Sequence, residues 1–178
     1  MRILGIDPGI ARVGWGIVDA RRQDFTAVDY GCITTPKEQG LPERLLFIFD
    51  SLNSLVEKYS PDLMAVEELF FAKNAKTAIA VGHGRGVCLL VAGKCGLPLE
   101  EVTPLQVKSS IVGYGNATKE QVGAMIKSIL GLSRMPRPDD VCDALAIAVA
   151  AGIKRSFRAR VVRSQKNGDG AGGNDIAT

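Results

Sequence analysis

The order of apolar and polar residues predicts three strands, a helix and a fourth strand in the first part of the chain. Apolar runs that are short, or that alternate with polar residues, predict strands at residues 2–7, 13–19 and 25–33. A short turn containing glycine joins the first two strands, which favours a hairpin. Over residues 42–59 the apolar positions recur every three or four residues, as on the buried face of an amphipathic helix. The apolar run at 63–67 predicts a fourth strand that is buried on both faces.

The rest of the chain alternates between helices and one further strand. We expect helices at residues 74–94, 105–112, 119–130 and about 140–154, and a strand at 97–102. Three antiparallel strands followed by strands that helices connect predict an α/β fold, in which a mixed five-stranded sheet carries helices on both faces. Gly82 and Gly86 lie four residues apart in the first of these helices. They predict close packing of that helix, within the chain or across a dimer.

The length of the chain predicts one domain and a tail. Its 178 residues are enough to bury a sizeable core. We assign residues 1–156 to the domain and residues 157–178 to a tail that is basic at first and then rich in glycine. After Arg163 the tail has almost no apolar residues, so we expect it to be disordered.

The composition excludes several classes of protein. Hydrophobic residues make up 46% of the chain and charged residues 23%, as in ordinary globular proteins. No apolar run approaches the roughly 20 residues that span a bilayer, and a strand begins at once, without room for a signal peptide. We therefore expect a cytoplasmic protein that does not act at membranes. The four cysteines lack zinc-site spacing and His83 is the only histidine, which disfavours structural zinc and catalysis by Ser-His-Asp or Cys-His groups.

Charge is unevenly distributed along the sequence. Residues 1–68 carry seven basic and eleven acidic side chains, whereas residues 69–130 carry seven basic and three acidic ones. Separate acidic and basic regions suit a site where metal ions meet a polyanion. Scattered surface charge explains the same composition, so the positions of the carboxylates have to decide between the two interpretations.

Two predicted strands end on carboxylates. Asp7 ends the first strand and is followed by Pro8 and Gly9, and Glu67 ends the strand at 63–67. Asp-Pro-Gly is also good turn chemistry, so Asp7 alone leaves a turn and a ligand as alternatives. If the two strands are neighbours, both carboxylates emerge at the same end of the sheet.

The segment DDVCDALAIAVAAGI supplies two further carboxylates, Asp140 and Asp143, which lie three residues apart on one face of a helix. The helix dipole tolerates an acid at Asp140, but Asp143 stands one turn further into an otherwise apolar helix, where an unpaired carboxylate is costly. Four carboxylates without histidine or thiolate partners favour Mg²⁺ or Mn²⁺. Two such ions stabilise the attacking and leaving oxygens in phosphodiester hydrolysis.

The segments ILGIDPG, AVEELFFAKN and DDVCDALAIA resemble the signature segments of the RuvC family, the bacterial Holliday junction resolvases with an RNase H-like fold. The resemblance extends in order from residue 1 to about 154. It implies that Asp7, Glu67, Asp140 and Asp143 are the catalytic, metal-binding tetrad. It further implies a Mg²⁺-dependent homodimer that nicks two opposed strands of a four-way DNA junction symmetrically. A preference for a short T-containing sequence and cooperation with the RuvA–RuvB branch-migration complex also follow.

Other residues near these segments are candidates for contact with DNA. The resemblance places Lys108 and Lys119 near the scissile phosphate and makes Phe70 the wedge that opens the junction, although core packing is the alternative for Phe70. Its polar, basic surroundings favour stacking on an unpaired base. We expect contacts to the phosphate backbone, without base recognition, from three further residues: Lys73, Lys76 and Arg85.

Three other functions are compatible with parts of this pattern. An actin-like or sugar-kinase ATPase also has Asp-x-Gly after its first strand, but it needs a second domain that 178 residues do not accommodate. A catalytically dead RNase H-like scaffold would usually lack one of the four acids. A related nuclease acting on RNA or on another branched DNA stays open.

Helix geometry does not separate Asp139 from Asp140, because both share a face with Asp143. Pro138 predicts that the helix begins here with Asp139 as its N-cap. The resemblance assigns the metal ligand to Asp140.

Overall fold

The computed structural model of the protein describes residues 1–22, 24–68 and 75–169, with the side chains of 75–77 and 162–169 left out of the description. One five-stranded sheet has the order β3-β2-β1-β4-β5. The strands are β1 (Arg2–Asp7), β2 (Arg12–Arg21), β3 (Asp24–Thr34), β4 (Leu63–Glu67) and β5 (Leu99–Val102). β1 pairs antiparallel with β2 and parallel with β4, and β5 lies parallel to β4. The predicted mixed sheet is therefore confirmed.

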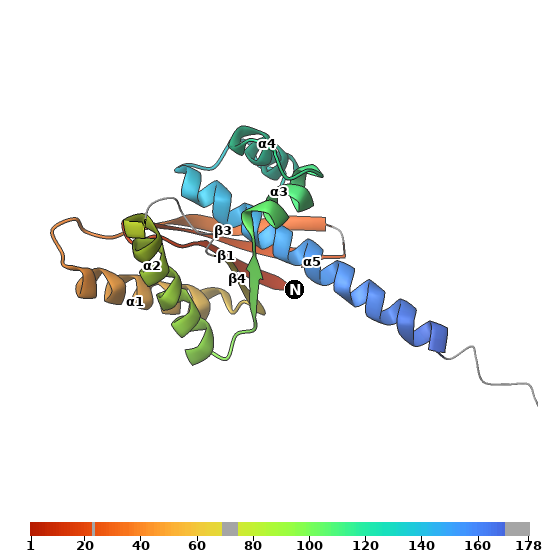
Figure 1. The fold of residues 1–178 in the computed structure, drawn as a ribbon, viewed down its shortest axis with the longest axis horizontal. Helices are drawn as coiled ribbons and strands as arrows, with labels where there is room; N and C mark the ends of the chain where they lie inside the picture. Colours follow the sequence, from red (N-terminus) through yellow and green to blue (C-terminus); the bar gives the residue numbers. More distant parts are fainter. Residues whose placement is uncertain (23, 69–74, 170–178) are drawn as a thin grey trace, which may run out of the picture.

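Helices cover both faces of this sheet (Figure 1). They are α1 (Leu41–Tyr59), α2 (Ala75–Lys94), α3 (Pro104–Val112), α4 (Lys119–Ile129) and α5 (Asp139–Asp169). α1 and α2 pack together on one face, and α5 crosses the other face with α3 and α4 above it (Figure 1). None of the described helices is long and apolar enough to cross a membrane.

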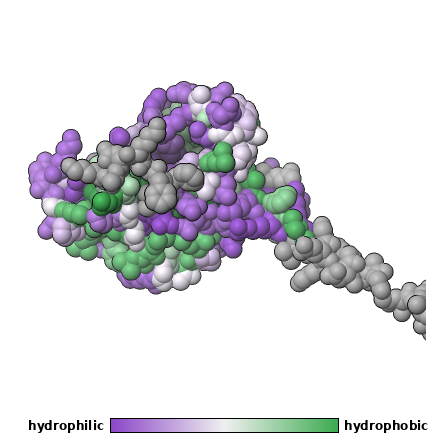
Figure 2. Space-filling model, viewed as in Figure 1, coloured by the Kyte–Doolittle hydropathy of each residue, from purple (hydrophilic) through white to green (hydrophobic). Residues whose placement is uncertain are grey.

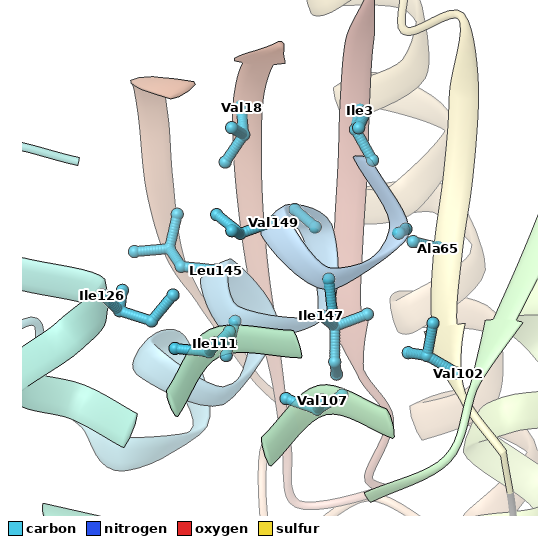
Figure 3. Packing of buried hydrophobic residues seen from close by; sticks show 14 of the residues in the cluster. Ile3, Val18, Ala65, Val102, Val107, Ile111, Ile126, Leu145, Ile147 and Val149 are labelled. Atoms are coloured by element: carbon cyan, nitrogen blue, oxygen red, sulfur yellow. The ribbon is translucent and has the colours of Figure 1, made fainter. Parts of the chain in front are cut away.

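Alternation of side chains along β1 divides the core between the two faces. Ile3 belongs to the cluster beneath α5, and Leu4 and Ile6 belong to the cluster beneath α1 and α2. In the first cluster, residues of the strands meet Leu145, Ile147 and other residues of α5, with α3 and α4 closing the far side (Figure 3). Because successive strand residues point to opposite faces, an odd-numbered residue of β1 points towards α5.

α5 is longer than the sequence predicts, because it continues to Asp169 rather than ending near Lys154. The buried carboxylate of Glu100 on β5 anchors this extension. Its Oε1 lies 2.7 Å from Nζ of Lys154, and its Oε2 lies 3.1 Å from Nη1 of Arg158. The apolar pattern stops where α5 leaves the sheet, whereas ion pairs and good helix-forming residues let the helix continue. Residues 164–169, which we expected to be disordered, are therefore helical, and 170–178 lie outside the described residues.

Within the chain, α2 packs closely at Gly84 rather than at the predicted Gly86. Gly84 is the buried one, and a Cβ added there would lie 2.6 Å from the carbonyl oxygen of Gly9. α2 therefore packs closely against the turn that follows Asp7. Around Gly86, by contrast, an added Cβ would have no atom within 4 Å, so this glycine faces open space.

Candidate active site

Asp7 and Glu67 lie side by side at the carboxyl ends of two neighbouring parallel strands. Ile6 of β1 pairs with Val66 of β4, so the residues that follow emerge at the same edge of the sheet. In β4, Leu63 and Ala65 belong to the cluster beneath α5, and the alternation directs Glu67 to that face. Asp7 points the same way, since it follows Ile3 by four residues. The strand order thus brings the first two predicted carboxylates together.

Gly14 on β2 seats the first turn of α5 beside this pair. Gly14 is the register partner of Asp7. A Cβ added at Gly14 would lie 1.9 Å from the carbonyl oxygen of Asp140, so only glycine lets the helix backbone approach the strand this closely. This close approach holds Asp140 and Asp143 over the ends of β1 and β4.

A cavity of about 390 Å³ opens between these elements. Its charged wall consists of Asp7, Glu67, Lys108, Lys119 and Asp143. Its apolar wall includes Val107, Val122 and Ile147, which are residues of the core beneath α5. Three predicted carboxylates and both predicted active-site lysines therefore share one cavity, and Asp140 lies outside its lining.

The carboxylates raise one another's pKa. The pKa of Asp7 is raised to about 7, first by burial and then by the charges of Asp143, Glu67 and Asp140. Burial and the charge of Asp143 also raise the pKa of Glu67. The free protein thus holds a group of acids in which full ionisation is unfavourable, and a bound cation would remove this cost.

Two basic side chains neutralise the carboxylates of α5. Nζ of Lys119, at the start of α4, donates to Oδ2 of Asp143 at 2.8 Å, and this bond raises the pKa of Lys119. Nε of Arg12 lies 3.3 Å from Oδ2 of Asp140. Sequence reasoning missed Arg12, because its position five residues after Asp7 gains meaning only when α5 lies across the strand.

The donor set fits a hard divalent cation, although the carboxylates are not gathered as a finished ligand set. Among the described residues, no three Asp, Glu, His or Cys side chains are arranged to hold a metal ion. Ion pairing of Asp140 and Asp143 with Arg12 and Lys119 explains this arrangement, as does repulsion among the acids. Oxygen-only donors and the raised pKa of Asp7 fit Mg²⁺ or Mn²⁺.

Asp139 has a different environment from Asp140. Asp139 is the first residue of α5 and its carboxylate pairs with Arg137, with 65% of its side chain exposed. The prediction that Asp139 is the N-cap is therefore wrong, because Asp139 already belongs to the helix and its carboxylate pairs with Arg137. Asp140, by contrast, lies against Gly14, and its charge raises the pKa of Asp7.

The structure describes only some of the residues that were predicted to contact DNA. Phe70 and Lys73 lie outside the described residues, and Lys76 is in the first turn of α2 with its side chain not described. Arg85 forms an ion pair with Glu101, and only 19% of its side chain is exposed. The position of β5 thus gives Arg85 a partner within the chain, and its contact with the DNA backbone stays a prediction.

Comparison with known proteins identifies one family over most of the chain. A family model described as Crossover junction endodeoxyribonuclease RuvC matches residues 3–151. The chain is 51% identical to the RuvC of Ruminiclostridium cellulolyticum over 152 residues, which cover 85% of this chain and 92% of that protein. It is 52% identical to the RuvC of Moorella thermoacetica over 160 residues, covering 90% and 96%.

A solved structure is similar over nearly the same extent. It is T. thermophilus RuvC in complex with a Holliday junction substrate, at 33% identity and a TM-score of 0.85, covering 89% of this chain and 96% of that one. Membership of this family implies the RNase H-like fold and dependence on a divalent metal ion. The chain belongs to the RuvC family of crossover junction endodeoxyribonucleases.

Proposed function

We propose that this protein resolves four-way DNA junctions by hydrolysing phosphodiester bonds in two opposed strands. The observation that carries the proposal is the cavity in which Asp7, Glu67 and Asp143 face Lys108 and Lys119. Acids that hold divalent cations, beside fixed lysines, suit a phosphodiester whose charge grows in the transition state. The junction-bound T. thermophilus relative supports the choice of substrate.

Asp7, Glu67, Asp140 and Asp143 would hold two Mg²⁺ ions in each active site, and Mn²⁺ would substitute for them. When bound, such ions lower the pKa of the attacking water and stabilise the leaving oxygen. Asp7 and Glu67 are fixed by the strands, so they define where the scissile phosphate can lie. The close contact between α5 and Gly14 fixes the positions of Asp140 and Asp143.

Lys108 and Lys119 would place positive charge beside the phosphate. Lys108 stands on α3 and shares the cavity with the carboxylates. Lys119 lies at the start of α4 and is held by Asp143 in the free protein. A fixed ammonium group at this position stabilises the charge that develops on the phosphate oxygens without needing to reorganise.

A homodimer would supply two active sites related by a two-fold axis, as a four-way junction requires for symmetric cutting. We assign its interface to the outer stripe of α2, formed by Ile79, Gly86 and Leu90. Ile79 and Leu90 are 61% and 60% exposed although both are apolar. Figure 2 shows hydrophobic residues gathered on the lower side of the molecule, where α1 and α2 lie (Figure 1). We also propose that the protein cooperates with the RuvA–RuvB branch-migration complex. This cooperation would take place in the cytoplasm, where the chromosomal DNA lies.

Cleavage of labelled substrates tests the proposed function. We expect paired nicks in a synthetic four-way junction with Mg²⁺ and no comparable cutting of a linear duplex of the same sequence. An RNA–DNA hybrid and a three-way junction distinguish the related nuclease activities. Cutting of the hybrid in preference to the four-way junction would contradict the proposal.

Gly86→Leu should weaken the dimer. The added side chain meets open space within the chain, so the fold should persist, but it would push a partner helix away from α2. Sedimentation velocity should show a shift towards monomer, and a melting curve should be close to that of the wild-type protein. An unchanged sedimentation profile would remove this stripe from the interface.

Phe70→Ala should reduce cutting of intact junctions by at least about fivefold, since a stacked base contributes about 1–3 kcal/mol. Folding should be unaffected if Phe70 is a wedge. Cleavage assays and thermal melting of the same preparations separate the two interpretations. A loss of stability of about 3–5 kcal/mol would identify Phe70 as a core residue instead.

Removal of residues 164–178 should leave junction cleavage nearly unchanged, because this segment has almost no apolar residues with which to pack. Removal from residue 155 onwards also deletes Arg158, a partner of Glu100, and should lower both stability and salt-dependent DNA binding. Cleavage, melting and binding at two salt concentrations check both truncations. Loss of junction-specific cutting in the shorter truncation would show that the tail belongs to the site.

A further inference from the structure

Arg12 is a basic residue at the active site to which the proposed chemistry gives no task. It opens β2, and its Nε lies 3.3 Å from Oδ2 of Asp140. Gly14 is two residues further along the strand, so it shares a face of the sheet with Arg12, and it lies directly against the backbone of Asp140. The same close approach that seats α5 therefore brings Arg12 to Asp140.

The pair has a counterpart about one turn further along the helix. Lys119 holds Asp143 at 2.8 Å as Arg12 holds Asp140. Asp140 and Asp143 thus each have their own cation, supplied by a different element of the fold. In the free protein these cations occupy oxygens that a divalent metal ion would need.

An arginine displaced from Asp140 keeps its charge, because a guanidinium does not lose its proton in proteins. More than half of the Arg12 side chain is exposed, at 55%, and the ion pair runs through Nε. The guanidinium presents its remaining N–H donors in a planar fork that matches two phosphate oxygens. Arg12 is therefore suited to a DNA phosphate at the rim of the active site once Asp140 is engaged elsewhere.

We propose that Arg12 is a phosphate-binding residue that Asp140 holds in the metal-free protein and releases when that carboxylate takes a metal ion. The inference rests on the proposed function, because the anion it assigns to Arg12 is the backbone of the junction DNA. It makes metal binding and DNA binding cooperative, and the coupling acts equally in both directions. Exchange of partners by one arginine is the physical link between the two ligands.

Junction binding without metal tests the exchange, because Asp140→Asn should release Arg12 as the metal ion does. In EDTA, we expect Asp140→Asn to tighten junction binding by about two- to fivefold, the range for a partly exposed ion pair. Adding Arg12→Ala to this variant should abolish most of the gain. Arg12→Ala in the wild-type background should have a smaller effect, since Asp140 already occupies the residue there.

Asp139→Asn is the matched control. It removes the same charge one residue away, from a carboxylate that pairs with Arg137 and not with Arg12. Any gain from the loss of negative charge alone should appear in this variant and should not depend on Arg12. Equal effects of Arg12→Ala in the Asp139→Asn and Asp140→Asn backgrounds would overturn the inference.

Metal affinity in the absence of DNA gives a second readout of opposite sign. Titration with Mn²⁺ should show tighter binding to Arg12→Ala, by about two- to fivefold, because the competing cation is gone. Arg12→Lys should stay close to the wild-type affinity, and Arg21→Ala, at the other end of β2, should not change it. Weaker Mn²⁺ binding by Arg12→Ala would show that Arg12 supports the site only structurally.

The outcomes separate the inference from the proposed function. A wild-type protein that does not prefer the four-way junction to linear duplex would count against the proposed function. A junction-preferring wild-type protein without coupling between Arg12 and Asp140 would overturn the inference alone. Melting curves of all variants confirm that each binding measurement concerns a folded protein.

Discussion

Asp140→Asn is expected to nearly abolish junction cleavage while junction binding survives. The amide keeps the size of the side chain, but its neutral oxygen is a poor ligand for a hard divalent cation. The backbone of Asp140 lies against Gly14, so the substitution leaves the position of α5 unchanged. We expect a loss of at least about a hundredfold in single-turnover cleavage rate, since one charged ligand of the metal ions is removed.

Asp139→Ala is the neighbouring control for this experiment. Asp139 pairs with Arg137 on the surface, where an ion pair contributes about 0–1 kcal/mol, so this variant should remain an active nuclease. Cleavage, junction binding and melting at saturating Mg²⁺ should be measured for both variants. An inactive Asp139→Ala together with an active Asp140→Asn would show that the tetrad has been assigned one residue too late.

Asp7→Asn should raise the thermal stability of the metal-free protein while it abolishes cleavage. The pKa of Asp7 is about 7 in the folded protein, above its ordinary value of 3.8, first because of burial and then because of the neighbouring acids. The folded state therefore binds more protons than the unfolded state between these values. The contribution of Asp7 to stability is greatest below about pH 4, falls as pH rises to about 7, and then levels off.

The neutral asparagine should remove this fall. Each unit of pKa shift corresponds to about 1.4 kcal/mol, so the variant should gain up to about 4 kcal/mol over the wild type at pH 8. At pH 4 the two proteins should be similar. Melting in EDTA across this range measures the difference, and Mg²⁺ should reduce it because a cation relieves the same repulsion.

Asp19 provides a control of opposite sign. A hydrogen bond from Arg2 and the charge of Arg2 lower the pKa of Asp19, so its ionised form supports the fold. Asp19→Asn should therefore lower stability at neutral pH. A loss of stability in Asp7→Asn at pH 8 would contradict the inference that the ionised Asp7 destabilises the folded protein.

Local sequence patterns were enough to predict the strands, most of the helices, and the acids that end β1 and β4. The helical periodicity at 42–59 and the apolar runs ending on Asp7 and Glu67 reflect local geometry, which period and side-chain type encode directly. Asp143 was also predictable as a functional residue, because burial of an unpaired carboxylate in an apolar helix is costly. The family resemblance added the selection of Asp140 over its neighbour.

Which side chains meet depends on how the strands and helices are arranged in three dimensions. The pairing of β1 with β4 brings Asp7 to Glu67, and the contact of Gly14 with the backbone of Asp140 brings α5 to both. Neither contact has a local signal, since each joins residues far apart in the chain. Ion pairs behave in the same way, because any surface acid can serve as a partner until the fold selects one. This is why Arg12 was overlooked.

The same reason accounts for the features that local patterns do not predict. The ion pair of Arg85 with Glu101 depends on the position of β5 in the sheet. The extension of α5 was missed because Glu100 stabilises it through ion pairs rather than through an apolar stripe. Hydrophobic periodicity indicates which face of a helix or strand is buried. Which residues that face contacts depends on the sheet order and on where α5 packs against Gly14.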